Sequence, residues 1–120
     1  AFLGVSYRGD VGDTRYTPVE TLVLKVQESN AQVYLHDPFI SFWQELECKV
    51  YTNIDDVLDR DPDIIIISTG HSAYRENSTL KKIMKLNSTK IFDTIGLFSS
   101  EQINQLEKKH TVSVLGRGDI

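Results

Sequence analysis

The sequence predicts an α/β domain with a mainly parallel sheet and helices on both faces of that sheet. Short apolar runs of strand length alternate with longer segments whose apolar residues have helical spacing, and this alternation is typical of βαβ units. The four consecutive isoleucines Ile64 to Ile67 need burial on both faces, as a central parallel strand provides. We therefore expect a three-layer α/β/α, Rossmann-like fold with five to six strands.

Six segments have the composition of strands, and each is followed by residues that favour a turn or loop. The first is followed by a stretch with two glycines and four charges, and the second ends before Pro38. The third is the weakest of the six. The strands expected from the sequence span residues 2–6, 31–35, 48–51, 64–68, 90–92 and 111–115.

Four segments have the apolar spacing or the capping residues of helices. In the first, Thr17 is the expected N-cap, Pro18 takes the first helical position and Glu20 completes a capping box. A second capping box is expected at Ser99 and Gln102. Residues 39–47 fit either a short helix or an irregular segment packed on the edge of the sheet. The expected helices span residues 17–29, 53–59, 78–86 and 99–106.

Composition and charge limit the classes of function. The 120 residues are 40% hydrophobic and 25% charged, so we expect residues 1–120 to form one domain rather than two catalytic units. The net charge of −4 argues against broad binding to nucleic acid but leaves room for one local anion site. The longest purely apolar run, residues 64–67, is too short to cross a membrane. Because the chain begins inside an expected strand, we expect a fragment of a longer protein.

Cysteine and histidine usage gives little support for a redox or metal centre. The single cysteine, Cys48, cannot form an internal disulfide, and no histidine lies near it in the sequence to activate it as a nucleophile. His36, His71 and His110 are scattered, with no cysteine or carboxylate spaced to join them, so we expect no metal site. A single reduced cysteine fits a cytoplasmic location.

Ligands of open α/β sheets bind beyond the carboxyl ends of the strands, so the loops at that edge are the candidate sites. The loop after the first strand has the strongest signal, because it places Arg8, Arg15 and several backbone N–H groups just before a helix N-terminus. These groups suit a phosphate or pyrophosphate; the structural alternative is that the arginines pair with Asp10 and Asp13. The G-x-G-x-x-G and G-x-x-x-x-G-K-[ST] motifs are absent, so an ordinary NAD or ATP site is not expected.

Two other residues at this edge have both a binding and a structural interpretation. Asp37 ends the second strand, where dinucleotide-binding folds place a ribose-binding acid. Without the glycine fingerprint, we expect Asp37 instead to cap the turn before Pro38. His71 follows the isoleucine strand and is either a general base or hydrogen-bond donor, or a loop histidine whose ring bonds to the backbone.

Four segments carry a resemblance to a known family. Residues 4–8 (GVSYR), 13–18 (DTRYTP), 33–38 (VYLHDP) and 68–74 (STGHSAY) resemble, in order and spacing, the C-terminal UDP-binding domain of the nucleotide-sugar dehydrogenases. The family pattern is a G-x-[AS]-[FY]-[KR] strand end, a D-x-R-x-[ST]-P helix entry and a [YH]-D-P at the second strand. The resemblance runs over essentially the whole chain. Members of the family oxidise UDP-glucose, UDP-N-acetylmannosamine or related sugars to uronic acids with two NAD.

The resemblance implies a UDP site on the loop after the first strand. Tyr7 and Arg8 match the aromatic and basic pair that meets the nucleotide. Arg15 matches a position that faces the ligand or the partner domain, and Asp13 and Thr17 are implied to order the loop. Two further candidates at the same edge are His71 and Asp93.

One arginine that the resemblance leads us to expect is missing. Many members carry D-G-R or D-T-R after the fifth strand, whereas this chain has Asp93-Thr94-Ile95. The resemblance therefore implies a divergent subgroup that acts on a different sugar, or that uses Arg75 or Arg117 in place of that arginine.

The family also has parts that residues 1–120 do not contain: an N-terminal NAD-binding domain, a central region that forms the dimer, and a catalytic cysteine. The resemblance implies a parent enzyme that needs NAD, acts on a UDP-sugar for surface polysaccharide synthesis and is a homo-oligomer. This chain alone would then hold no catalytic residue and be inactive. The alternative is a non-enzymatic module that binds a nucleotide or CoA. A receiver-like signalling domain is disfavoured, because Ser68 and Thr69 stand where its acceptor aspartate would be.

Overall fold

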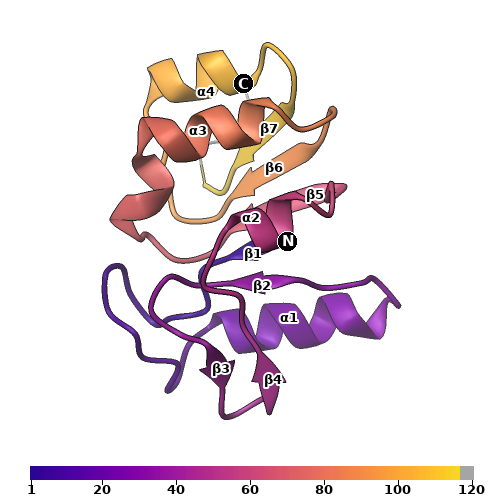
Figure 1. Ribbon diagram of the computed structural model, residues 1–120, viewed down its shortest axis with the longest axis vertical. Helices are drawn as coiled ribbons and strands as arrows, with labels where there is room; N and C mark the ends of the chain where they lie inside the picture. Colours follow the sequence, from indigo (N-terminus) through magenta and orange to yellow (C-terminus); the bar gives the residue numbers. More distant parts are fainter. Residues whose placement is uncertain (117–120) are drawn as a thin grey trace.

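A computed structural model describes residues 1–116 of the chain, and its main element is a five-stranded sheet in the order β2-β1-β5-β6-β7 (Figure 1). All neighbouring strands in this sheet are parallel. The expected parallel sheet is therefore confirmed, at the lower of the two expected strand numbers. Its strands are β1 (Phe2–Leu3), β2 (Leu35–His36), β5 (Ile64–Ile67), β6 (Lys90–Asp93) and β7 (Thr111–Val114).

Helices cover both faces of this sheet, as the three-layer expectation requires. Helix α1 packs on one face, and α2, α3 and α4 contribute to the core on the other (Figure 1). A short 3-10 helix, η1, leads into α3. The bounds are α1 (Val19–Glu28), α2 (Asp55–Leu58), η1 (Ser72–Arg75), α3 (Asn77–Met84) and α4 (Ser100–Leu106).

Two hydrophobic cores form because side chains of a strand alternate between the faces of a sheet. Phe2 belongs to the core that contains Val23 of α1. Its neighbour Leu3 belongs to the core that contains Ile83 of α3 and Leu106 of α4. The two residues of β1 thus tie both layers of helices to the centre of the sheet.

The isoleucine strand β5 is central, as expected. Ile65 and Ile67 are fully buried in the core of α2, α3 and α4, and Ile66 packs from the other face against the core of α1. Ile64 differs from the expectation: as the first residue of the strand it remains 47% exposed.

The expected strand at residues 48–51 is not a member of the main sheet. Cys48–Lys49 (β4) pairs antiparallel with Phe42–Trp43 (β3), and only Tyr51 forms a parallel bridge to His36. The expected strand is thus present at Cys48–Lys49, whereas residues 39–47 form neither a short helix nor an irregular segment but contribute the other half of a hairpin. The hairpin lies next to α1 in Figure 1. Trp43 is fully buried in the core of α1, so burial of this ring holds the hairpin on that layer.

Strand β1 ends earlier than expected, at Leu3, and Gly4 is the first residue after it. This residue has φ +106°, and an added Cβ would lie 2.3 Å from the Cβ of Thr69, so only glycine fits. The next two amides, of Val5 and Ser6, donate hydrogen bonds to the Asp37 side chain instead of to a neighbouring strand. The loop after β1 therefore begins at residue 4.

The two expected capping boxes have different outcomes. At α4 the box is confirmed: the Ser99 hydroxyl accepts from the Gln102 N–H at 3.2 Å, and the Gln102 side chain accepts from the Ser99 N–H at 2.9 Å. At α1 the reciprocal box is absent, because the N-cap is Pro18, but the Thr17 hydroxyl still accepts from the Val19 N–H at 3.4 Å. Thr17 is buried, and its carbonyl rather than its hydroxyl accepts from the Glu20 N–H, at 3.3 Å.

Candidate functional site

The loops after β1, β2, β5 and β6 lie at one edge of the sheet, on the left in Figure 1. The chain passes from β1 to β2 on one side of β1 and then returns to β5 on its other side, so the strand order reverses between β1 and β5. Open α/β sheets bind ligands beyond such a switch point. The two loops that flank it are residues 4–18, here called the first loop, and residues 68–71, here called the β5 loop.

The buried carboxylate of Asp37 holds the start of the first loop. Its Oδ2 accepts from the N–H groups of Val5 at 3.0 Å and Ser6 at 3.1 Å and from the Ser6 hydroxyl at 2.8 Å. Its Oδ1 accepts from the Phe39 N–H at 2.9 Å, which confirms the expected turn before Pro38. Since the side chain is fully buried, it offers no surface to a ribose.

Burial and hydrogen bonding act in opposite directions on this carboxylate. Burial raises the pKa of Asp37, but hydrogen bonds from His71 and from the amides of Phe39 and Val5 lower it, and the pKa ends below its ordinary value. Asp37 is therefore charged at neutral pH and acts as a fixed acceptor for the first loop.

His71 lies between Asp37 and the tip of the first loop. Its Nε2 donates to Asp37 Oδ2 at 2.9 Å, and its Nδ1 accepts from the N–H of Asp10 at 2.9 Å. The ring is fully buried and both nitrogens are engaged. The ring thus bonds to the backbone, as the structural interpretation expected, and in addition donates to a carboxylate, whereas no nitrogen is open for base catalysis.

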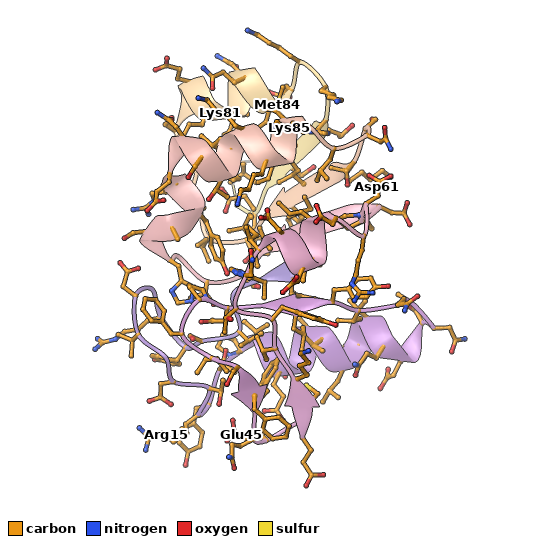
Figure 2. The ribbon with its side chains drawn as sticks, viewed as in Figure 1. Arg15, Glu45, Asp61, Lys81, Met84 and Lys85 are labelled. Atoms are coloured by element: carbon orange, nitrogen blue, oxygen red, sulfur yellow. The ribbon has the colours of Figure 1, made fainter. Side chains whose placement is uncertain are left out.

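Arg15 is paired with Asp13, as the structural alternative proposed. Its Nε and Nη2 donate to the two carboxylate oxygens at 3.0 and 2.8 Å. Together with a hydrogen bond from the Arg15 backbone N–H at 2.9 Å, these side-chain bonds lower the pKa of Asp13 to about 2, and the side-chain bonds raise the pKa of Arg15. The adjacent Thr14 hydroxyl donates to Glu45 at 2.6 Å and so ties this part of the loop to the turn of the β3–β4 hairpin; Figure 2 shows Arg15 and Glu45 at the same end of the molecule.

Tyr7 and Arg8 are presented to solvent. Tyr7 is 60% exposed, Arg8 is also exposed, and within residues 1–116 Arg8 has no carboxylate at salt-bridge distance. The structural alternative, pairing with Asp10, does not hold for Arg8: Asp10 accepts instead from the N–H and the hydroxyl of Ser72. In the described part of the chain, the first loop therefore presents one guanidinium group free to bind an anion.

Tyr16 is a site residue that the sequence alone did not assign. It is 93% exposed, has φ +57°, and lines a hollow of about 340 Å³ together with Tyr7, Asp13 and Arg15. An aromatic residue directly after a charged D-x-R segment is the signal that would have found it. Exposed rings beside guanidinium groups suit a nucleotide, because rings stack on a base and guanidinium groups bind phosphate.

The loop after β6 is built differently. Asp93 is fully buried, and its two oxygens accept from the N–H groups of Ile95 and Phe98, both at 3.1 Å. Its carboxylate therefore orders its own loop and is not presented to a ligand. Ile95 is 42% exposed, and its Cδ1 would lie 3.2 Å from a Cβ added at Gly70, so this apolar side chain sits beside the β5 loop.

Only one of the two suggested substitute arginines can be located. Arg75 ends η1 and is exposed. It is close enough to Asp10 to act on it: hydrogen bonds from Ser72 lower the pKa of Asp10, and the charge of Arg75 lowers it further. Arg117 lies outside the described residues.

Another hollow, of about 480 Å³, lies between α2 and α3, away from the switch point. It is lined by residues that include Asp61 and Lys85, both labelled in Figure 2. Lys82 and Asp55 pair across it at 3.0 Å. Within residues 1–116 no cluster of three metal-ligating side chains occurs, and none of the helices there is long and apolar enough to cross a membrane.

The fold and the first loop define a class: a Rossmann-like α/β domain with an exposed guanidinium group and aromatic rings at its switch point. Comparison with protein families narrows the class, since residues 1–100 match the UDP binding domain of the UDP-glucose/GDP-mannose dehydrogenase family. The chain belongs to this family. The resemblance seen in the sequence is therefore confirmed.

Individual relatives agree with this assignment. The chain is 28% identical, over 98% of its length, to the UDP-N-acetyl-D-mannosamine dehydrogenase of Methanococcus maripaludis, and 28% identical, over 73% of its length, to that of Methanococcus aeolicus. It spans only 27% and 19% of these proteins. The crystal structure of NDP-N-acetyl-D-galactosaminuronic acid dehydrogenase from Methanosarcina mazei Go1 matches with a TM-score of 0.79 and 25% identity, over 98% of this chain and 24% of that one.

Proposed function

We propose that this chain binds the UDP part of a UDP-sugar and that the first loop is its binding surface. The observation that carries the proposal is the exposed Arg8, which has no ionic partner in the described part of the chain and stands next to Tyr7 at the switch point. Membership of a UDP-binding-domain family supports the choice of nucleotide.

Each residue of the first loop has a distinct part in this proposal. The planar guanidinium of Arg8 binds the diphosphate by donating two parallel hydrogen bonds to its oxygens. Tyr7 and Tyr16 offer their rings to the uracil and ribose. Arg15 joins the phosphate contacts when the negative charge of the ligand competes with Asp13 for its guanidinium; until then Asp13 keeps that group in place. Thr17 is buried at the end of the first loop, and its packing there keeps the loop ordered.

The parent protein is proposed to be an NAD-dependent dehydrogenase in which residues 1–120 are the C-terminal UDP-binding domain. It would oxidise the primary alcohol of a UDP-hexose or UDP-N-acetylhexosamine to the uronic acid for surface polysaccharide synthesis, with two NAD each accepting a hydride and water supplying the second oxygen. NAD and the catalytic residues would be held by an N-terminal domain. The dehydrogenase names of the relatives support this proposal.

Within that enzyme, residues 1–120 would contribute binding energy and close the sugar site against the N-terminal domain, and they would be inactive alone. A homo-oligomeric enzyme in the cytoplasm fits the family resemblance and the free thiol of Cys48. His71 and Asp93 have no direct part in ligand binding in this proposal, because their polar atoms are occupied by the protein itself.

Calorimetric titration of the full-length protein with UDP, ADP and CoA, in the presence of saturating NAD so that the proposed NAD site is filled, tests the choice of nucleotide. The proposal predicts saturable binding of UDP, weaker binding of ADP because its purine base differs, and no binding of CoA. Binding of ADP or CoA without binding of UDP would instead support a non-enzymatic nucleotide or CoA module.

A further inference from the structure

We infer that His71 is a positioning residue for the first loop: it holds Asp10 so that Tyr7 and Arg8 face the ligand. This inference rests on the proposed UDP-binding function of the loop. His71 itself cannot touch a ligand, because its ring is fully buried and both nitrogens are engaged within the protein. Any effect of His71 on binding must therefore pass through the loop.

The hydrogen bonds of the ring fix its tautomer. Nδ1 accepts from the amide N–H of Asp10 and so carries no proton, and Nε2 carries the proton that it donates to Asp37. The Asp37 oxygen that accepts this proton also accepts from the amides of Val5 and Ser6. One imidazole thus links the start of the first loop, at residues 5 and 6, to its tip, at residue 10.

The tip is held from a second direction by the residue that follows His71. The Asp10 carboxylate accepts from the Ser72 N–H at 2.9 Å and from the Ser72 hydroxyl. Asp10 has φ +62°, a left-handed conformation that costs free energy for a residue other than glycine. The bonds to His71 and Ser72, here called the latch, keep Asp10 in that conformation.

The backbones of the first loop and the β5 loop also pack closely against each other next to the latch. A Cβ added to Gly9 would lie 2.2 Å from the carbonyl oxygen of Gly70, so the two backbones touch. The Thr69 hydroxyl donates to the carbonyl of Ser6 at 2.8 Å. These contacts hold the backbone at residues 6, 9 and 10 in place. Tyr7 and Arg8, the two exposed residues between them, are therefore attached to an ordered backbone on both sides.

A loop that is ordered before the ligand arrives binds more tightly, because the ligand does not have to supply the free energy of ordering. The latch accordingly raises affinity without contacting UDP. Opening it should weaken UDP binding by about tenfold, the effect of losing one buried hydrogen bond together with the order it maintains.

Two variants separate the two hydrogen bonds of the ring. In His71→Asn, the side-chain Oδ1 stands near the place of Nδ1 and still accepts from Asp10, but the bond to Asp37 is lost. In His71→Gln, the side-chain Nε2 stands near the place of the imidazole Nε2 and still donates to Asp37, but the bond to Asp10 is lost. Each variant removes one bond and keeps the other, so the pair serves as its own control.

The measurement is made on the full-length protein in two parts: the UDP dissociation constant, and the exchange rate of the Asp10 amide hydrogen without ligand. The inference predicts that His71→Gln speeds this exchange and weakens UDP binding about tenfold, whereas His71→Asn keeps both within about threefold of the wild type. Equal weakening in both variants, or wild-type affinity in His71→Gln, would overturn it.

A third variant guards against loss of folding. Ser72 is exposed, and Ser72→Ala removes one bond to Asp10 while leaving the buried ring untouched. Weaker UDP binding, by about threefold, is expected, and unchanged affinity would contradict the latch. If the wild type itself does not bind UDP, the proposed function fails, and the exchange rates of the Asp10 amide in the two His71 variants still decide whether the latch exists.

Discussion

The first loop and the loop after β6 meet the same edge of the sheet and are both ordered by a buried aspartate, yet they present different groups to solvent. Asp37 organises the first loop and Asp93 organises the loop after β6, each by accepting hydrogen bonds from backbone amides. The first loop then presents Arg8, whereas the second presents Ile95. The comparison teaches that the acids at this edge are structural and that the ligand-binding groups are the side chains that they leave exposed.

The largest difference between the two loops should appear in stability. Asp37→Ala leaves three amides, one hydroxyl and the Nε2 of His71 without their acceptor, and a loss of about 3–5 kcal/mol in the free energy of unfolding is expected. Asp93→Ala leaves only two amides without one, so about 2 kcal/mol is expected. Urea denaturation measures both, and equal losses would contradict the comparison.

Removing the exposed cation of the first loop should have the next largest effect. Arg8→Ala deletes a charged, two-pronged phosphate contact, and UDP affinity should fall by about 10- to 100-fold. Arg8→Lys keeps the charge without the fork, so an intermediate loss is expected. Calorimetry measures these constants, with Lys81→Ala as the control, because Lys81 is an exposed cation on α3, far from Arg15 in Figure 2. A loss in the control as large as that in Arg8→Ala would show a general charge effect.

The loop after β6 offers the converse experiment. Ile95 lies beside Gly70, which touches the first loop, at the position where the family resemblance places an arginine. Ile95→Arg should therefore raise UDP affinity by about tenfold, because it adds a second cation beside the diphosphate. Stability should change little, since Ile95 is already exposed. Unchanged UDP affinity would show that the loop after β6 does not contact the nucleotide, so that only the first loop binds it.

The smallest effect concerns the Asp13–Arg15 pair on the surface of the first loop. The pKa of Asp13, about 2, lies below its ordinary value of 3.8, so the pair contributes above pH 3.8 and is lost as the pH falls towards 2. An NMR titration of the Asp13 carboxylate should have its midpoint near 2 in the wild type. In Arg15→Gln the midpoint should rise part of the way towards 3.8, because the two guanidinium hydrogen bonds are removed while the backbone N–H of residue 15 still donates to Asp13. A midpoint that does not move would show that Arg15 is not the partner in solution.

Periodicity predicted the layers of the fold but not the details that depend on distant contacts. The alternation of apolar runs was sufficient for the parallel sheet, and the isoleucine run marked its centre. The hairpin at residues 42–49 was missed because its cause is the burial of Trp43 against the layer of α1. At Thr17 the capping pattern held in part: the hydroxyl accepts from the Val19 N–H, whereas the Glu20 N–H bonds to the Thr17 carbonyl instead.

The candidate site was predictable as a loop but not as an arrangement of side chains. Sequence position alone placed Arg8 and Arg15 together, yet it could not tell that Arg15 is paired and that Arg8 has no ionic partner within residues 1–116. His71 and Asp10 are separated by 61 positions, so only the fold brings them together. An aromatic residue directly after the D-x-R segment is the sequence signal for Tyr16, but the 93% exposure of Tyr16 in the fold is what makes it a candidate site residue.

A crystal structure of the full-length protein with bound UDP tests most directly the claim that the first loop is the nucleotide-binding surface. The account predicts Arg8 nitrogens about 2.7–2.9 Å from diphosphate oxygens, with Tyr7 or Tyr16 against the nucleoside and Asp10 still bonded to His71. UDP held elsewhere, for example in the hollow between α2 and α3, with Arg8 left in solvent, would contradict it.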